Sequence, residues 1–184
     1  GAAEARGLAL GDRVISEQIV PCWECRVCRR GPYWMCNRKH DVYGFRQRTP
    51  GAMAEYMAFP RDAIVHRVPE SLSLRQAVYI EPLACAIHAV QRATIELGDT
   101  VVISGCGPLG LGMVAAARLK SPGLLIALDL KPERLALAKQ CGADLVLNPR
   151  ETDVVEEARR LTEGYGPDVY IEATGHPSSV VQGL

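Results

Sequence analysis

Four cysteines lie close together near the start of the chain, at Cys22, Cys25, Cys28 and Cys36. This compact set of thiolates can close a tetrahedral zinc site, and because four protein ligands leave no open position, such a zinc would be structural. An iron–sulfur cluster is a weaker alternative, since the ferredoxin-type run has three residues before its last cysteine and a proline after it. Here seven residues precede the last cysteine and Asn37 follows it. Unligated thiols or disulfide pairs remain a third interpretation.

A glycine-rich turn follows an apolar strand in the second half of the chain. Its sequence, Gly-Cys-Gly-Pro-Leu-Gly, matches G-x-G-x-x-G and opens a helical pattern. In that context the glycines permit a tight turn, close approach of a pyrophosphate and packing of the helix on the strand, with the anion at the helix N-terminus. The motif therefore predicts a dinucleotide site at Gly105, Gly107, Pro108 and Gly110.

Asp129 ends the next strand, nineteen residues after Gly110. A carboxylate at this point would bond the ribose hydroxyls of NAD and repel the 2′-phosphate of NADP. The alternative is a local capping role ahead of Lys131 and Pro132.

Glu81 lies in an otherwise apolar stretch that runs from Tyr79 to His88. An unpaired buried charge is costly, so this carboxylate needs a helix dipole, a metal, a metal-bound water or a substrate hydroxyl. A functional role and plain capping both stay open. Because Pro82 suits a first helical turn and disfavours helical geometry just before it, we expect Glu81 at a helix break, outside the new helix. We expect His88 and the remaining cysteines to be core residues. These cysteines are Cys85, Cys106 and Cys141.

The elements that carry these residues differ between the two halves of the chain. Residues 1 to about 70 contain short β signals between Gly and Pro punctuation. The predicted strands are 12–20, 52–59 and 63–68. The loop 21–50 has little periodicity, so a metal is the obvious candidate for holding it together. A helical region follows, with Ser73 and Gln76 as a capping-box signature.

From about residue 97 the pattern alternates between strands and helices. The predicted strands are 101–104, 125–129, 145–147 and 169–172, and the helices between them are 109–120, 132–141 and 153–162. This βαβαβαβ run predicts a doubly wound parallel sheet. A complete Rossmann domain has six strands, so we expect this sheet to be cut off. The predicted domains are 1–95 and 96–184.

Composition narrows the class of protein. Lys plus Arg and Asp plus Glu both number 21, so no strong net charge draws the chain to nucleic acid or an acidic membrane. Four basic residues of the cysteine loop could suggest a nucleic-acid module, but solvated cations near a thiolate centre are the simpler explanation. These are Arg29, Arg30, Arg38 and Lys39. The chain has no targeting or membrane-spanning pattern. Four of its seven cysteines are spaced for metal binding in a reducing compartment and not for disulfides, so we expect a soluble cytoplasmic protein.

Taken in order, these motifs resemble the zinc-dependent medium-chain alcohol and polyol dehydrogenases. The resemblance rests on the cysteine loop, on Gly51 to Tyr56, which is similar to a G-G-x-A-E-Y strand, on Glu81 to Ala84, and on Gly105 to Gly110 with Asp129. The Glu-Pro-Leu version is similar to the branch that holds the sorbitol, threonine and butanediol dehydrogenases.

The resemblance implies part of a GroES-like β domain followed by a partial Rossmann domain, an α/β architecture. It also implies that Leu109 and Arg134 help to line the NAD site, and that Glu81 faces a catalytic zinc directly or through water. The expected activity is zinc-dependent hydride transfer from a secondary alcohol or polyol to NAD, by a homo-oligomer. Because the first catalytic zinc ligands would precede Gly1, we expect this chain to lack a full active site. L-Threonine 3-dehydrogenase and a non-catalytic, zinc-stabilised nucleotide-binding fragment are the alternatives.

Overall fold

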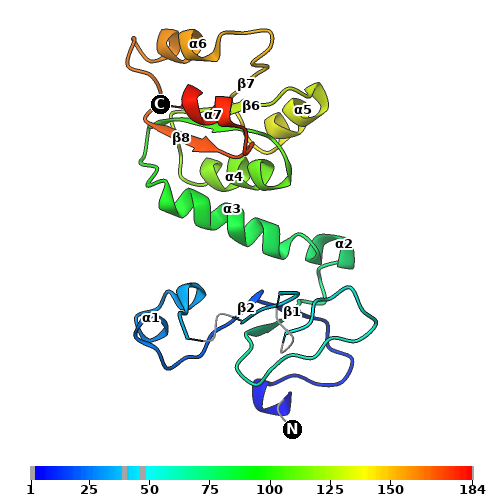
Figure 1. Ribbon diagram of the computed structural model, residues 1–184. Helices are drawn as coiled ribbons and strands as arrows, with labels where there is room; N and C mark the ends of the chain where they lie inside the picture. Colours follow the sequence, from blue (N-terminus) through cyan, green and yellow to red (C-terminus); the bar gives the residue numbers. More distant parts are fainter. Residues whose placement is uncertain (1–2, 39–40, 46–48, 184) are drawn as a thin grey trace. The chain divides into compact units, whose positions relative to one another are not determined.

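The computed structural model describes residues 3–38, 41–45 and 49–183, so Lys39 of the cysteine loop lies outside the described residues. The chain divides into two compact units, Gly1–Val78 and Tyr79–Leu184 (Figure 1). The helix that follows residue 79 is thus grouped with the second unit. The predicted boundary between residues 95 and 96 stays a prediction.

The first unit is built from short elements. Two antiparallel strand pairs, β1 with β4 and β2 with β3, form separate two-stranded sheets. Helix α1 and the 3₁₀ turn η2 lie inside the cysteine loop, and α2 closes the unit. The bounds are η1 Glu4–Arg6, β1 Val14–Ser16, β2 Ile19–Val20, α1 Arg26–Arg29, η2 Tyr33–Met35, β3 Asp41–Val42, β4 Val65–Arg67 and α2 Leu74–Ala77.

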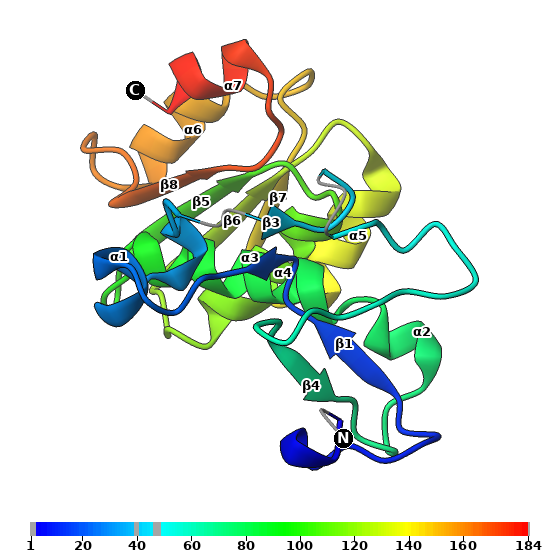
Figure 2. The same cartoon turned by 60° about the horizontal axis from the view of Figure 1, so that its bottom comes forward.

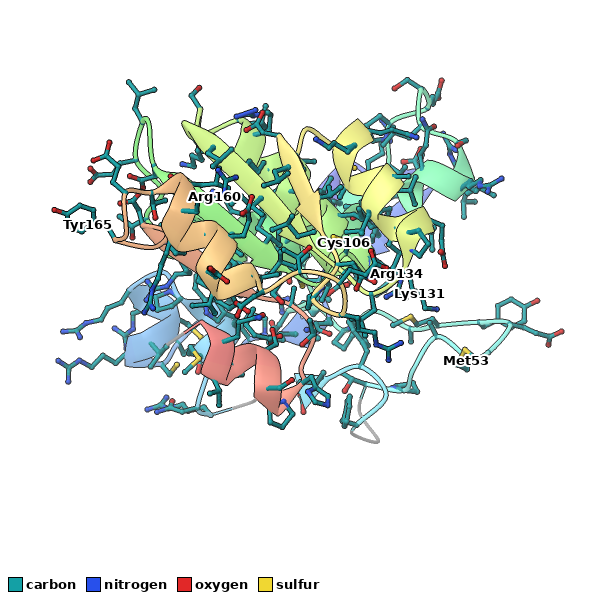
Figure 3. The ribbon with its side chains drawn as sticks, turned by 90° about the horizontal axis from the view of Figure 1, so that it is seen from above. Met53, Cys106, Lys131, Arg134, Arg160 and Tyr165 are labelled. Atoms are coloured by element: carbon teal, nitrogen blue, oxygen red, sulfur yellow. The ribbon has the colours of Figure 1, made fainter. Side chains whose placement is uncertain are left out.

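The strand predictions for this unit were partly wrong. The strand expected at 63–68 is β4, but the one expected at 12–20 is divided into β1 and β2. Residues 52–59 form no strand, and Met53 and Tyr56 in them are 103% and 90% exposed. Met53 is labelled in Figure 3. Apolar alternation favours a strand only where a neighbour supplies backbone partners, and no described strand pairs with this segment.

Helix α3 (Ile80–Arg92) opens the second unit and corrects two expectations. The capping box before it, at Ser73 and Gln76 of α2, is confirmed. Glu81, however, lies within the first turn of α3 and is exposed. A proline in a first turn removes only an N–H that has no helical partner, so Pro82 requires no break. His88 is exposed on this helix as well, so its placement in the core was wrong.

The rest of the second unit is a parallel sheet with helices on both faces (Figure 2). The strand order is β7-β6-β5-β8, and every pair is parallel. This is the order in which a dinucleotide-binding domain begins, so the predicted fold class is confirmed. The bounds are β5 Thr100–Ser104, α4 Pro108–Arg118, β6 Leu124–Leu128, α5 Pro132–Gln140, β7 Leu145–Leu147, α6 Val154–Leu161, β8 Val169–Glu172 and α7 Pro177–Gln182.

Alternate strand residues build two apolar layers around this sheet. Val101, Ile103 and Leu125 pack in the layer with α3, α4 and α5. Val102 and Ile126 face the opposite way, into the layer that contains α6. Figure 1 shows α3 and α4 on one side of the sheet and α6 and α7 on the other. Burial on both faces explains why β6 and the interior of β5 are apolar without interruption. None of the helices in the described ranges combines the length and apolar character that a bilayer span requires.

Candidate functional site

The four predicted cysteines meet in the first unit. Their sulfur atoms all lie within 4.8 Å of one another, and each residue is at most 6% exposed. The Sγ–Sγ distances are 3.4 Å between Cys25 and Cys28 and 4.0 Å between Cys22 and Cys28. None of these cysteines forms a disulfide. Zinc–sulfur bonds of about 2.3 Å in a tetrahedron separate the sulfurs by about 3.8 Å, so the cluster fits one zinc ion.

Backbone N–H groups point at these sulfurs. Cys22 N donates to Cys36 Sγ at 3.4 Å, Cys25 N donates to Cys22 Sγ at 3.3 Å, and Cys28 N donates to Cys25 Sγ at 3.4 Å. Cys25 is also the N-cap of α1, so the short helix and the cluster share a residue. Such donors stabilise negative charge on sulfur, which favours a metal-binding thiolate set over neutral core cysteines.

The glycine turn joins β5 to α4 in the second unit, and two of its glycines are required by close contacts. Gly105 has φ +101°, and a Cβ there would lie 2.9 Å from the carbonyl carbon of Ala173 and from Cγ2 of Thr174. A Cβ on Gly110 would lie 1.7 Å from the carbonyl oxygen of Gly105. At Gly107 a Cβ would meet nothing within 4 Å, so this backbone faces open space that a phosphate could approach.

That open space is a cleft of about 770 Å³ at the carboxyl ends of the strands. Gly105, Gly107, Asp129 and Arg134 line it, and Thr174 faces them from the other side. Pro108 and Leu109, in the first turn of α4, are exposed. The predicted cofactor residues of the turn and of β6 therefore lie at one end of one sheet, where a dinucleotide would bind.

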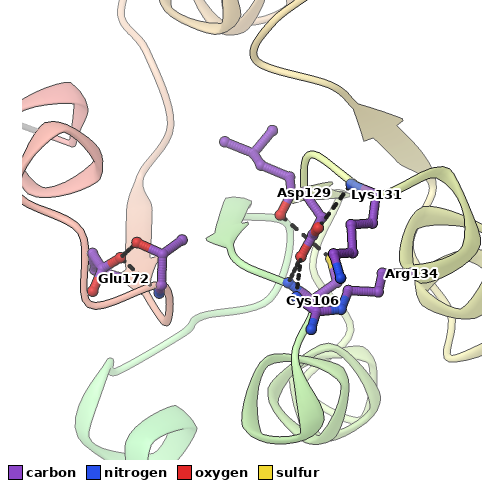
Figure 4. Close-up of polar contacts among 7 residues, drawn as sticks. Cys106, Asp129, Lys131, Arg134 and Glu172 are labelled. Atoms are coloured by element: carbon purple, nitrogen blue, oxygen red, sulfur yellow. Dashed lines mark hydrogen bonds and ion pairs between the residues drawn. The ribbon is translucent and has the colours of Figure 1, made fainter.

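Asp129 follows β6, and its side chain is 8% exposed. Its Oδ2 accepts a hydrogen bond from the backbone N–H of Cys106 at 2.8 Å, and its Oδ1 accepts one from the N–H of Lys131 at 2.9 Å (Figure 4). Arg134 Nη1 lies 3.5 Å from Oδ2. Lys131 is the N-cap of α5. Asp129 thus makes the local capping contact with Lys131 and also lies beside the glycine turn.

These contacts determine the charge state of Asp129. Burial raises the pKa of the carboxyl, but the N–H groups of Lys131 and Cys106 and the cation of Arg134 outweigh that effect and hold it below its ordinary value. The thiol of Cys106 is fully buried, as predicted, and burial together with the Asp129 charge raises its pKa to about 12. The carboxylate is ionised at neutral pH, and the thiol is neutral.

Glu81 does not line the cleft of the second unit. Its Oε1 accepts a hydrogen bond from Cys85 Sγ at 3.3 Å, one helical turn away. Cys85 is exposed, so its assignment to the core was wrong. In the described part of the chain, the cysteine cluster is the one group of three or more His, Cys, Asp and Glu side chains close enough to hold a metal ion. The role of Glu81 at a catalytic zinc stays a prediction.

Two features were missed from the sequence, one that lines the cleft and one next to it. Ser104 and Ser179 are buried and their hydroxyl oxygens lie 2.8 Å apart, joining the end of β5 to α7. Glu172, the last residue of β8, accepts hydrogen bonds from the backbone N–H groups of Thr174 and Gly175. The sequence Glu-Ala-Thr-Gly after an apolar strand was the available signal, since a carboxylate two or three residues before a glycine suits a turn.

Comparison with known proteins gives two family matches. A model described as "Alcohol dehydrogenase GroES-like domain" matches residues 1–70, and one described as "Zinc-binding dehydrogenase" matches residues 108–184. An erythritol/L-threitol dehydrogenase of Mycolicibacterium smegmatis is 57% identical over 183 residues, which are 100% of this chain and 50% of that protein. A sorbitol dehydrogenase of Bacillus subtilis is 40% identical over 95% of this chain and 49% of its own length. The chain spans about half the length of the curated relatives it matches.

Solved structures agree with the fold. An oxidoreductase of unknown specificity from Escherichia coli has a TM-score of 0.88 and 30% identity, over 97% of this chain and 51% of its own. A zinc-binding dehydrogenase from Sinorhizobium meliloti, bound to NADP, has a TM-score of 0.83 and 32% identity, over 96% of this chain and 51% of its own. The predicted resemblance is confirmed at the level of family and fold.

Proposed function

The chain belongs to the zinc-binding dehydrogenase family with a GroES-like domain, and we propose that the full-length protein oxidises a polyol by transferring a hydride to NAD. The observation that carries the proposal is the cleft at the ends of β5 and β6, where an open glycine turn faces an ionised Asp129. The names of the relatives support a polyol over L-threonine as the substrate. The four-carbon polyols erythritol and L-threitol are the first candidates, from the relative at 57% identity.

The residues of the cleft suit the parts of NAD. The free N–H groups in the first turn of α4 would bind the pyrophosphate, and the backbone at Gly107 leaves room for it. Asp129 Oδ1 accepts one hydrogen bond, from Lys131 N–H, so it keeps a lone pair for a ribose hydroxyl, because the three donors use fewer than the roughly four lone-pair sites of a carboxylate. Bound NAD supplies the hydride acceptor, and this chain's residues bind and orient it.

We propose a preference for NAD over NADP because the charge of Asp129 would repel a 2′-phosphate. The cation of Arg134 offsets part of that repulsion. Because a solved structure of 32% identity is bound to NADP, the assay below compares the two cofactors directly.

The first unit has a different role in this proposal. A zinc ion held by the four cysteines would order a loop that has little core of its own. Glu81 would act near a catalytic zinc. The seven cysteines, none of them in a disulfide, support a reducing compartment, and we propose a cytoplasmic homo-oligomer. Light scattering on the purified protein tests the oligomeric state.

The deciding experiment is an NADH-formation assay on the full-length protein. Erythritol, L-threitol and sorbitol are compared with ethanol and L-threonine, each with NAD and with NADP. We expect the highest kcat/KM with a polyol and NAD. Oxidation of L-threonine alone would contradict the polyol assignment. NADH binding without oxidation of any alcohol would favour a zinc-stabilised nucleotide-binding module.

A further inference from the structure

Glu172 ends β8 on the side of the glycine turn opposite Asp129. Its register partner on β5 is Ser104, the residue directly before Gly105. The carboxylates of Asp129 and Glu172 therefore lie at the ends of β6 and β8, the two strands that flank β5, one on each side of the turn (Figure 4).

The Glu172 carboxylate is occupied by the loop that follows it. Its Oε1 accepts the N–H of Thr174 at 2.7 Å and the Thr174 hydroxyl, and its Oε2 accepts the N–H of Gly175 at 3.0 Å. Burial raises the pKa of this carboxyl, but the bonds from Thr174, Gly175 and Ser179 outweigh burial and leave the pKa below its ordinary value. The charged form of Glu172 thus fixes the conformation of residues 173–175.

That loop is packed directly on the glycine turn. Ala173 N donates to the carbonyl oxygen of Ser104 at 2.8 Å. The contacts that exclude a Cβ at Gly105 come from Ala173 and Thr174, both at 2.9 Å. Thr174 also lines the cleft. A shift of the loop would therefore change the wall of the cleft and the support of the turn together.

The strand order assigns this wall to one half of the cofactor. The pyrophosphate crosses the glycine turn after β5, and Asp129 after β6 is placed for the adenosine ribose. The nicotinamide half must then extend to the other side of β5, toward β8. We propose that Glu172 is a positioning residue for the nicotinamide half of the cofactor, acting through the Thr174–Gly175 loop. This inference rests on the proposed function.

The test compares matched variants of the full-length protein. NADH affinity is measured by fluorescence titration, and the affinity of AMP, which carries only the adenosine half, by displacement of NADH. Glu172→Gln should weaken NADH binding by on the order of tenfold, as expected for one charge-assisted hydrogen bond, and change AMP affinity by less than about twofold. Glu157→Gln is the control, because Glu157 is a half-buried carboxylate of helix α6 that pairs with the exposed Arg160 and does not line the cleft. It should change neither affinity.

Other outcomes separate the possible failures. Unchanged NADH affinity in Glu172→Gln, or an equal loss for NADH and AMP, would overturn the inference. Should that variant not fold, Thr174→Val removes one partner of the carboxylate and must show the same NADH-selective loss. Failure of the unmodified protein to bind NADH would instead overturn the proposed function and this inference with it.

Discussion

Two glycines in helix α4 provide a matched test of how the cofactor turn is built. At Gly110 a Cβ would lie 1.7 Å from the carbonyl oxygen of Gly105, whereas carbon and oxygen normally approach to roughly 3.3 Å. Gly110→Ala must therefore move the backbone of the turn by about 1.5 Å. At Gly112 a Cβ would meet the hydroxyl of Tyr79 at 2.7 Å and Cβ of Ala86 at 2.9 Å, so that substitution forces α3 and α4 apart instead.

Both substitutions should destabilise the protein. Overpacking costs about 1–3 kcal/mol, and replacing a helical glycine by alanine returns roughly 1 kcal/mol, so the net loss is at most about 2 kcal/mol in each case. Cofactor binding should separate them. A displacement of about 1 Å in a binding geometry can cost a hundredfold, so Gly110→Ala should weaken NADH binding at least tenfold, whereas Gly112→Ala should leave it within about twofold.

Urea unfolding and NADH titration on both variants check these numbers. Tyr79 donates a hydrogen bond to the carbonyl oxygen of Pro108 at 2.6 Å, and Tyr79→Phe removes the hydroxyl that crowds position 112. Gly112→Ala should therefore cost less in a Tyr79→Phe background. Normal NADH affinity in Gly110→Ala, or a stabilisation by Gly112→Ala of the size of the helix-propensity gain, would refute the reasoning.

Four further outcomes are expected. Cys25→Ser should lower the zinc content and loosen the loop without changing NADH affinity. X-ray absorption at the zinc edge of the unmodified protein should show a shell of sulfur ligands alone at about 2.3 Å. Iron in the protein, or a mixed nitrogen and oxygen shell, would contradict this assignment. Asp129→Ser should reduce a preference of roughly a hundredfold for NAD over NADP, measured as the ratio of kcat/KM values, and equal use of both cofactors by the unmodified enzyme would rule it out. Glu81→Gln in the full-length enzyme should lower kcat with NADH affinity and thermal stability nearly unchanged; near-normal kcat with a small stability loss would indicate a capping role. The pKa of Asp129 is lowered in the folded protein. Its contribution to stability is therefore complete above the pKa of about 3.9 in the unfolded chain, and it is lost as the pH falls through the lower pKa of the folded state. Asp129→Asn should consequently lose less stability than the unmodified protein between about pH 5 and about pH 3, measured by urea unfolding at each pH.

The sheet and its glycine turn could be predicted because their signals are local. Uninterrupted apolar runs marked β5 and β6, and the glycine spacing marked the turn between β5 and α4. The Cys22–Cys36 spacing predicted a metal cluster for the same reason, since a tetrahedral ion constrains residues that are near one another in sequence. Glu172 was missed because its importance comes from β8 lying beside β5, which the sequence does not display.

The errors occurred where a local preference was weak and the surroundings decided the outcome. Residues 52–59 have the composition of a strand, but no described strand pairs with them. On α3 the buried residue beside Val90 is Ala86, whereas the larger Ile87 is 40% exposed. Alanine fits at position 86 because Gly112 of α4 approaches it closely, and only small residues fit where α3 and α4 pack together.

Asp129 shows how a residue in a sequence motif can have a structural role before any ligand binds. Its predicted role was to accept a ribose hydroxyl, and the structure adds that it holds the N–H of Cys106 in the middle of the glycine turn. Both roles need an ionised acceptor, and Arg134 helps to keep it ionised. The carboxylate that we propose selects against a 2′-phosphate therefore also orders the turn that would bind the pyrophosphate. For this reason a neutral side chain at position 129 should relax the choice between cofactors and weaken the affinity for both, because selectivity and affinity depend on the same charge.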